Sequence, residues 1–373
     1  MTNKTLSAAK KAKKNEFYTQ YADIDSEIQS YLSYDADVFR GKTILLPCDD
    51  PDWSNFTKFF AENFELFGLK KLISTSYAFN AKKNYLQGCL PGLENKVSET
   101  ILNSANYDEK SDSEHGKIFI LDEDTNKSGH IDIEDLKWEY LKGDGDFRSP
   151  EVTALRDEAD FVITNPPFSL FREFLAWIVE ADKKFAIIGN QNAITYKDVF
   201  PLVIQNKVWL GKGFPGGAGH FISQYEDIAT AGNHVKGMIR VSGVVWFTNI
   251  EHGRRHTPLK LMTKAENIKY SKHKVVKGIG YHKYDNYDAI EIPFTDAIPS
   301  DYDGVMGVPI TFLDKYCPEQ FEIVGATESE GHGFSNGLWN AASGTAQALV
   351  EGARAYKRIF IRFRKPQGKE KKK

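Results

Sequence analysis

Two consecutive prolines stand inside residues 160–178, DFVITNPPFSLFREFLAWI, where an apolar run ends and a helical pattern begins. Proline has no backbone N–H and holds its own φ at about −65°, so it does not continue a central strand. It also keeps the preceding residue out of the helical region. The stretch therefore predicts a buried strand at 161–164, an extended Asn165 at the tip of that strand, and a helix over 170–180.

Strand-like and helix-like runs alternate through the first two thirds of the chain. A helix-like run at 55–68, closed by Gly68, follows the first of these strand-like stretches: 43–47, 70–78, 117–121, 160–164, 183–189 and 238–250, the last of which reads as one or two strands. This alternation predicts a mainly parallel, doubly wound α/β sheet. Ligands of such sheets bind beyond the carboxyl ends of the strands, and the polar turns after residues 47 and 164 are candidates for that crevice.

The sequence divides into three parts of different character. Residues 1–14 form a basic stretch that we interpret as a flexible arm, residues 15–250 carry the alternating pattern, and residues 251–373 lose it. The net charge of the whole chain is −3, but residues 251–373 hold 20 Lys and Arg against 15 Asp and Glu, in clusters interleaved with aromatic residues. Such clusters are typical of nucleic-acid binding. We therefore expect a catalytic domain followed by a nucleic-acid-binding region with a basic tail.

Composition also indicates the compartment. No apolar run approaches the roughly 20 residues that a membrane span needs, and the basic N-terminal stretch does not contain the apolar core of a secretory signal. Cys48, Cys89 and Cys317 are odd in number and far apart, which argues against a disulfide framework and for a reducing environment. We expect a cytoplasmic, nucleoid-associated protein that does not enter a membrane.

The residues Asn165-Pro166-Pro167-Phe168 suit one kind of reaction. The lone pair of an amino group on a planar ring is delocalised, so its nitrogen is a poor nucleophile until acceptors hold its N–H groups. The Asn165 side-chain oxygen and the Pro166 carbonyl can both accept, and Phe168 offers a face for stacking. Catalysis would rest on positioning and electrostatics rather than on proton abstraction. The motif resembles the signature of amino-group methyltransferases that use S-adenosyl-L-methionine.

Three short segments resemble parts of the cofactor site of those enzymes. The turn after the first strand departs from the usual pattern, because it has acids in place of glycines; these acids could bond a ribose or an ammonium group. Residues 15–20 resemble the N-terminal Phe-Tyr-Thr element that folds over the methionine end, and 145–147 resemble the acid–aromatic pair that contacts the adenine. The resemblance implies these cofactor-binding residues: Phe17, Tyr18, Thr19, Pro47, Cys48, Asp49, Asp50, Asp146 and Phe147.

Four segments, in this order, resemble the EcoRI-type adenine-specific DNA methyltransferases: NEFYTQYADIDSEI at 15–28, ILLPCDDPDWSNF at 44–56, DFVITNPPFSLFREF at 160–174 and MGVPITFLDKYCPEQFEIVG at 306–325. The resemblance implies a Rossmann-like class I methyltransferase sheet followed by a target-recognition region. It also implies methyl transfer to N6 of adenine in double-stranded DNA, with the base flipped out to reach Asn165 and stack on Phe168. A monomeric enzyme and a cognate restriction endonuclease that acts separately are further expectations.

Within this interpretation, Lys and Arg contact the DNA phosphates, and the candidates are Arg254, Arg255, Lys272 and Lys274. Two alternatives stay open. The first is a methyltransferase of the same chemistry that acts on guanine N2 in structured RNA, where this motif is also common. The second is a DNA-binding protein that keeps the fold without the activity, which the intact motif argues against.

Two further stretches imitate ligand sites. The segment DTNKSGHIDIED at 124–135 has the spacing of a calcium loop, but the strand-like 117–121 precedes it and 130–136 alternates, so we expect a β-hairpin. The glycine-rich 211–217 does not have the Walker spacing, so we expect a mobile loop near the DNA. The histidines and cysteines have no metal-ligand spacing, and no metal is expected.

Overall fold

The computed structural model describes residues 19–49, 54–78, 108–222, 238–328 and 333–364. Its internal contacts divide the chain into two units. The first contains the described residues up to Gln191 together with Leu210–Glu251, and the second contains Asn192–Trp209 and the described residues from His252 onward. The short helix α10 (Phe200–Ile204) therefore belongs to the second unit, where Phe200 packs on Phe334 with ring centroids 5.0 Å apart.

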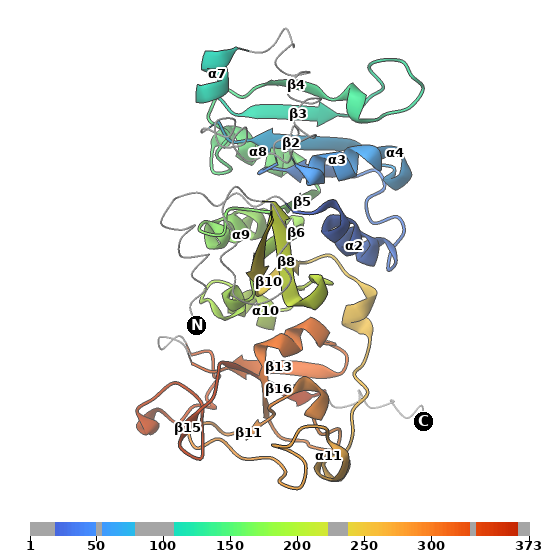
Figure 1. Cartoon of the computed structure of the whole chain (residues 1–373). Coiled ribbons are helices and arrows are strands. Elements are labelled where there is room, and N and C mark those ends of the chain that lie inside the picture. The colour runs from blue at the N-terminus through green and yellow to red at the C-terminus, as the bar shows by residue number, and fades with distance from the viewer. Residues whose placement is uncertain (1–18, 50–53, 79–107, 223–237, 329–332, 365–373) are drawn as a thin grey trace, which may run out of the picture. The chain divides into compact units, whose positions relative to one another are not determined.

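An eight-stranded sheet forms the centre of the first unit (Figure 1). Its strand order is β4-β3-β2-β1-β5-β6-β10-β7. The bounds are β1 Thr43–Leu46, β2 Lys71–Ser76, β3 Lys117–Leu121, β4 Lys137–Tyr140, β5 Phe161–Thr164, β6 Lys184–Asn190, β7 Trp209–Leu210 and β10 Val244–Thr248. The predicted strand at 161–164 is confirmed at both ends, and the helix that follows it, α9, begins one residue later than predicted and covers Phe171–Glu180.

The direction of the strands is more mixed than the sequence predicted. The four central strands β2, β1, β5 and β6 run parallel, as expected for a doubly wound sheet. Strands β3, β4 and β10 pair antiparallel with their neighbours. The antiparallel direction of β3 at 117–121 agrees with the hairpin expected there, and the parallel part of the sheet consists of its four central strands. An apolar run as short as KIFIL is compatible with a parallel or an antiparallel strand, so its pattern does not predict the direction of the strand.

The hairpin expected at the calcium-like segment is confirmed, but its second strand lies further along the chain. Strand β3 pairs antiparallel with β4 at 137–140, whereas the predicted strand at 130–136 contains the 3₁₀ turn η1, Ile133–Asp135. The reason is the Asp135 carboxylate, which accepts from the N–H groups of Thr125 and Asn126 at 2.8 and 3.0 Å and so closes a loop. Among the described residues, no group of three or more His, Cys, Asp or Glu is arranged to hold a metal ion.

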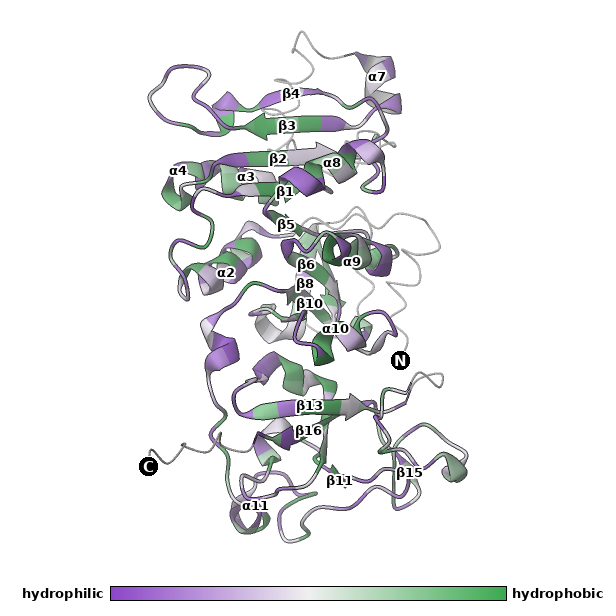
Figure 2. Ribbon diagram, turned by 180° about the vertical axis from the view of Figure 1, so that it is seen from behind, coloured by the Kyte–Doolittle hydropathy of each residue, from purple (hydrophilic) through white to green (hydrophobic). Residues whose placement is uncertain are grey.

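Helices cover both faces of the sheet, as Figures 1 and 2 show from opposite sides. On one face lie α2 Tyr21–Leu32, α3 Asn55–Glu62 and α4 Phe64–Phe67, and on the other lie α8 Pro150–Glu158 and α9; α7 covers Glu109–Glu114. Ser54 caps α3 and Ser149 caps α8, each by accepting from a backbone N–H of the first turn. The predicted helix at 55–68 is thus present as α3 and α4, and Gly68 closes it at a φ of 62°.

The core of the first unit lies between the sheet and the helices α2, α3 and α4. Phe39, Phe60 and Phe161 meet there, with Phe39 5.2 Å from Phe161 and 6.0 Å from Phe60 between ring centroids. The two-stranded hairpin of β8 (Ala218–Ile222) and β9 (Met238–Ser242) adds Phe221, Ile239 and Val241 to this core. The apolar stretch 238–250 therefore forms two strands, β9 and β10.

The second unit contains a four-stranded sheet in the order β11-β12-β16-β13. The bounds are β11 Ile290–Glu291, β12 Met306–Pro309, β13 Phe321–Ala326 and β16 Arg358–Phe363, with a small hairpin of β14 Leu349–Val350 and β15 Ala353–Arg354. Helix α11 covers Lys264–Tyr270, and the 3₁₀ turns outside η1 are η2 Gln191–Thr195, η3 Pro215–Gly217, η4 Gly253–His256, η5 Thr295–Ala297, η6 Ile310–Lys315 and η7 Ala341–Ser343. No helix among the described residues has the length and apolar character needed to cross a membrane.

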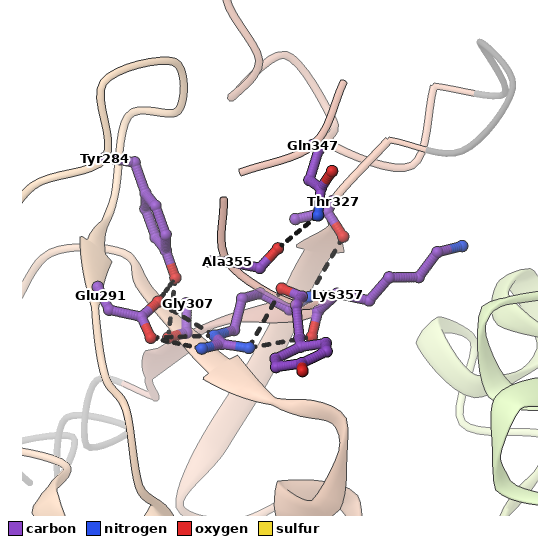
Figure 3. A network of polar contacts seen from close by, with 9 residues as sticks. Tyr284, Glu291, Gly307, Thr327, Gln347, Ala355 and Lys357 are labelled. Carbon is purple, nitrogen blue, oxygen red and sulfur yellow. Dashed lines mark hydrogen bonds and ion pairs between the residues drawn. The ribbon is translucent and has the colours of Figure 1, made fainter. Parts of the chain in front are cut away.

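A buried ion pair holds the edge of this second sheet together (Figure 3). The Arg358 guanidinium donates to both oxygens of Glu291, with the shortest N–O distance 2.6 Å, and the Tyr284 hydroxyl donates to the same carboxylate. Arg358 also donates to the carbonyls of Tyr356 and Lys357. This network connects β11 to β16, which are not neighbours in the sheet.

Candidate active site

The Asn-Pro-Pro-Phe motif lies at the carboxyl end of β5, in the middle of the large sheet. From β1 the chain first adds β2 on one side and later β5 on the other, so β1 and β5 flank the point where the strand order reverses. Ligands of open α/β sheets bind at this point. The motif is followed by a tight turn, in which the Leu170 N–H donates to the Pro167 carbonyl at 2.9 Å, and α9 begins at the next residue.

Asn165 is half-buried, and its side-chain amide is held by Thr19. The Asn165 Nδ2 donates to the Thr19 Oγ1 at 3.3 Å. Since the nitrogen end of the amide points to Thr19, the oxygen end points away from it. Pro166 is buried, whereas Phe168 is half-buried and packs at the margin of the core. Part of its ring is therefore accessible for stacking.

The turn after β1 is tied to the end of β5 by one buried carboxylate. Asp49 is 6% exposed. Its Oδ1 accepts from the Ser54 hydroxyl and its Oδ2 from the Thr164 hydroxyl, both at 2.6 Å. Its backbone N–H donates to the Thr75 carbonyl on β2 at 3.0 Å. The end of β1 is thus fixed to β2, to β5 and to the start of α3, while Pro47 beside it is buried and Cys48 half-buried.

The segment Gly145-Asp146-Phe147 lies at the carboxyl end of β2. Gly145 has a φ of 84°, and a Cβ at that residue would lie 2.2 Å from the Ser76 carbonyl oxygen, so only glycine fits this approach. Arg148 donates to both oxygens of the Asp146 carboxylate and lowers its pKa. The Phe147 ring is buried, 4.9 Å from Phe174 and 5.5 Å from Trp177 between centroids. Only the backbone of Phe147 remains for a ligand.

The described cofactor candidates therefore lie along adjacent strand ends. Thr19, Asp49 and Asn165 are connected by hydrogen bonds through Ser54, Asn55 and Thr164, and Asp146 lies at the tip of the neighbouring strand β2. Phe17, Tyr18 and Asp50 lie outside the described residues.

The four predicted DNA contacts belong to the second unit and differ in exposure. Arg255 is 3% exposed, its guanidinium lies 3.9 Å from the centroid of the Trp209 ring, and it donates to Asn206. The Arg255 guanidinium thus contacts residues inside the unit, and its predicted contact with phosphate stays a prediction. Arg254 pairs with Asp314, and Lys272 pairs with Asp296 at 2.7 Å. Lys272 and Lys274 are exposed.

One buried carboxylate of the first unit was not predicted from the sequence. Glu27 of α2 is fully buried and accepts from the Tyr31 hydroxyl at 2.6 Å and from the N–H groups of Lys212 and Gly213 at 3.1 and 3.2 Å. Burial and the Glu27 charge raise the pKa of Tyr31, so its hydroxyl keeps its proton and donates. The glycine-rich loop is thus bound to α2. An acid on the same helical face as Ile24, Ile28 and Tyr31 was the available signal.

A doubly wound sheet with Asn-Pro-Pro-Phe at the strand-order reversal defines a class, the amino-group methyltransferases. Comparison with known proteins identifies the family: the family model described as "Adenine-specific methyltransferase EcoRI" matches residues 5–364. The chain belongs to this family. The activity expected from the sequence, that of an adenine-specific DNA methyltransferase, is thereby confirmed, and a guanine-modifying RNA enzyme has no support.

Curated relatives agree over most of their length. The chain is 43% identical to "Type II methyltransferase M.EcoRI" of Escherichia coli over 331 residues, which cover 87% of this chain and 89% of the relative. It is 33% identical over 324 residues to "Type II methyltransferase M.MpnI" of Mycoplasma pneumoniae, with 85% and 83% covered. It is 32% identical over 322 residues to "Type II methyltransferase M.MgeORF184P" of Mycoplasma genitalium, with 85% and 84% covered. No solved structure matches the chain.

Proposed function

We propose that this protein methylates N6 of adenine at one short sequence of double-stranded DNA, with S-adenosyl-L-methionine as methyl donor. It would act as a monomer in the cytoplasm, at the nucleoid, as the modifying half of a restriction–modification system with a separate endonuclease. The observation that carries the proposal is the placement of Asn165-Pro166-Pro167-Phe168 at the carboxyl end of β5, beside the end of β1, with the Asn165 amide held by Thr19.

The residues of the motif have different roles at the target base. The Asn165 Oδ1 and the Pro166 carbonyl accept the two N–H groups of the adenine amine, which draws the nitrogen towards a tetrahedral form and frees its lone pair. Phe168 stacks on the flipped base and holds its plane. Pro166 and Pro167 have no N–H, so they cannot compete as donors for those acceptors. These interactions strengthen as charge develops on the nitrogen, which is the condition for catalysis.

The strand ends fit S-adenosyl-L-methionine by the chemistry of their acceptors. This cofactor has an amine, ribose hydroxyls and a positive sulfonium, and when bound it supplies an electrophilic methyl group. Arg148 lowers the pKa of Asp146, so this carboxylate is ionised at neutral pH and can accept from an amine or a hydroxyl. The other proposed contacts are Phe17, Tyr18, Pro47, Cys48, Asp50 and the backbone of Phe147. The side chains of Thr19 and Asp49, also expected at the cofactor from the sequence, form hydrogen bonds to Asn165, Ser54 and Thr164 instead.

The proposed phosphate contacts are Arg254, Lys272 and Lys274. Lys272 and Lys274 lie after α11, where both side chains are exposed. Exposed ammonium groups that replace counterions of DNA make affinity fall with salt. Removal of one such lysine is therefore expected to weaken binding to all DNA sequences alike and to reduce the salt dependence of binding.

The direct test is Asn165→Ala. The variant is expected to bind DNA with affinity close to that of the wild type and to transfer methyl groups about 100-fold more slowly or worse. Affinity is measured by fluorescence anisotropy of labelled duplex DNA, and transfer by incorporation of tritiated methyl groups in a single turnover. Asn165→Asp, which retains an acceptor oxygen, is the matched variant and should keep more activity than Asn165→Ala. Unchanged turnover in Asn165→Ala would refute the mechanism.

A further inference from the structure

Six residues around the motif form a closed ring of contacts. We call it the positioning ring and define it as Thr19, Asp49, Ser54, Asn55, Thr164 and Asn165. Four hydrogen bonds and two peptide-bonded neighbour pairs, 54–55 and 164–165, complete the circuit. The ring joins the segment before α2, the turn after β1, the start of α3 and the end of β5, which are the elements expected to meet cofactor and target base.

The Asp49 half of the ring is buried. Each carboxylate oxygen accepts from one hydroxyl at 2.6 Å, and the two donors, Ser54 and Thr164, are 4% and 0% exposed. Hydrogen bonds to an ionised carboxylate are shorter and stronger than neutral ones. Thr164 directly precedes Asn165, so the carboxylate controls where the catalytic residue leaves the strand.

The Thr19 half of the ring orients the catalytic amide itself. The Asn55 Nδ2 donates to the Thr19 carbonyl at 2.8 Å, which fixes the backbone of Thr19 relative to α3. The Thr19 hydroxyl accepts from the Asn165 Nδ2 at 3.3 Å. Thr19 is 3% exposed, so its hydroxyl is within the protein interior. An amide held by its nitrogen presents its oxygen in one direction.

We infer that Thr19 and Asp49 are positioning residues for Asn165: Thr19 selects the rotation of the amide, and Asp49 fixes the strand end that bears it. This inference rests on the proposed role of Asn165. It changes the expectation for Asp49, because this residue is 6% exposed and its two carboxylate oxygens already accept from the buried hydroxyls of Ser54 and Thr164. A misplacement of about 1 Å at a reacting group can cost roughly 100-fold in rate, so the ring has a measurable effect on turnover.

The test uses substitutions that keep shape and remove a hydroxyl. Thr19→Val and Thr164→Val are expected to lower the single-turnover rate about tenfold or more, with the KM for S-adenosyl-L-methionine and the affinity for DNA within about threefold of wild type. Thr19→Ser and Thr164→Ser retain the hydroxyl and should restore most of the rate. Thr248→Val is the matched control, since Thr248 is fully buried and donates to the Phe185 carbonyl at 2.7 Å outside the ring; it should keep the wild-type rate.

The outcomes separate the ring from the proposed function. A Thr19→Val enzyme with an unchanged rate and a raised cofactor KM would make Thr19 a cofactor contact and overturn the inference. A wild-type rate in Thr164→Val would overturn the inference that Asp49 positions Asn165. If Asn165→Ala is inactive while both valine variants are fully active, only the ring fails. If Asn165→Ala is active, the proposed function fails, whatever the valine variants do.

Discussion

The buried ion pair of the second unit allows a quantitative prediction. The Arg358 and Glu291 side chains are 10% and 12% exposed, and they are joined by contacts of 2.6, 3.0 and 3.2 Å. Burial and the Glu291 charge raise the pKa of Tyr284, so this residue stays neutral and donates to the carboxylate. Glu291→Gln keeps the shape of the side chain but leaves the Arg358 charge buried without a counter-charge.

The magnitude follows from that burial. Breaking a buried pair by removing one partner costs about 3–5 kcal/mol, because an uncompensated charge is left in the interior. The same strand supplies a matched control. Arg362 pairs with Glu322 at 2.8 Å, but these side chains are 52% and 39% exposed. Glu322→Gln should therefore lower the free energy of opening of this sheet by about 1 kcal/mol or less, although glutamate is replaced by glutamine in both variants.

Native-state hydrogen exchange in increasing urea measures both effects locally. The amides of β16, Arg358–Phe363, pair with β12 and β13, and their exchange reports the free energy of opening of this sheet. The measurement does not require the whole chain to unfold in one step. If Glu291→Gln lowered this free energy no more than Glu322→Gln does, the argument from burial would be refuted.

Three further predictions concern the first unit. Gly211→Ala would place a Cβ 1.9 Å from the Glu27 Oε1, so it should destabilise this unit by about 1–3 kcal/mol in a urea titration; an unchanged midpoint would show that the contact is not tight. Tyr31→Phe removes a donor to the same carboxylate and should lower the free energy of unfolding by about 1–3 kcal/mol. A decrease below about 0.5 kcal/mol, the range of surface substitutions, would contradict this role of the Tyr31 hydroxyl. Because Arg148 lowers the pKa of Asp146, the stability that Asp146 contributes is present above its unfolded pKa of about 3.9 and is lost as the pH falls through the lower folded value. Arg148→Gln should therefore weaken the dependence of stability on pH in this acid range. If the stability of the variant fell with pH in the same way as that of the wild type, Arg148 would have no part in this dependence.

Features that depend on neighbouring residues were predictable from the sequence. The two prolines after Thr164 interrupt the chain by their own covalent structure, so the end of β5 and the start of α9 were located within one residue. Gly68 ended the helical stretch for a similar reason, since it adopts a positive φ.

Features that depend on distant residues were not predictable. The hydrogen bond between Asn165 and Thr19 joins residues 146 positions apart, and that between Thr164 and Asp49 joins residues 115 positions apart. The residues next to Thr164 and Asn165 in the sequence do not indicate these partners. Arg255 shows the same limit for charge, because a basic cluster does not indicate which of its members is buried on an aromatic ring.

The most direct test of the central claim is methylation sequencing of plasmid DNA incubated with the purified protein and S-adenosyl-L-methionine. We expect N6-methyladenine at one short sequence and the loss of that signal with Asn165→Ala. Absence of methylated adenine from DNA, with a preparation that still binds the cofactor, would contradict that claim.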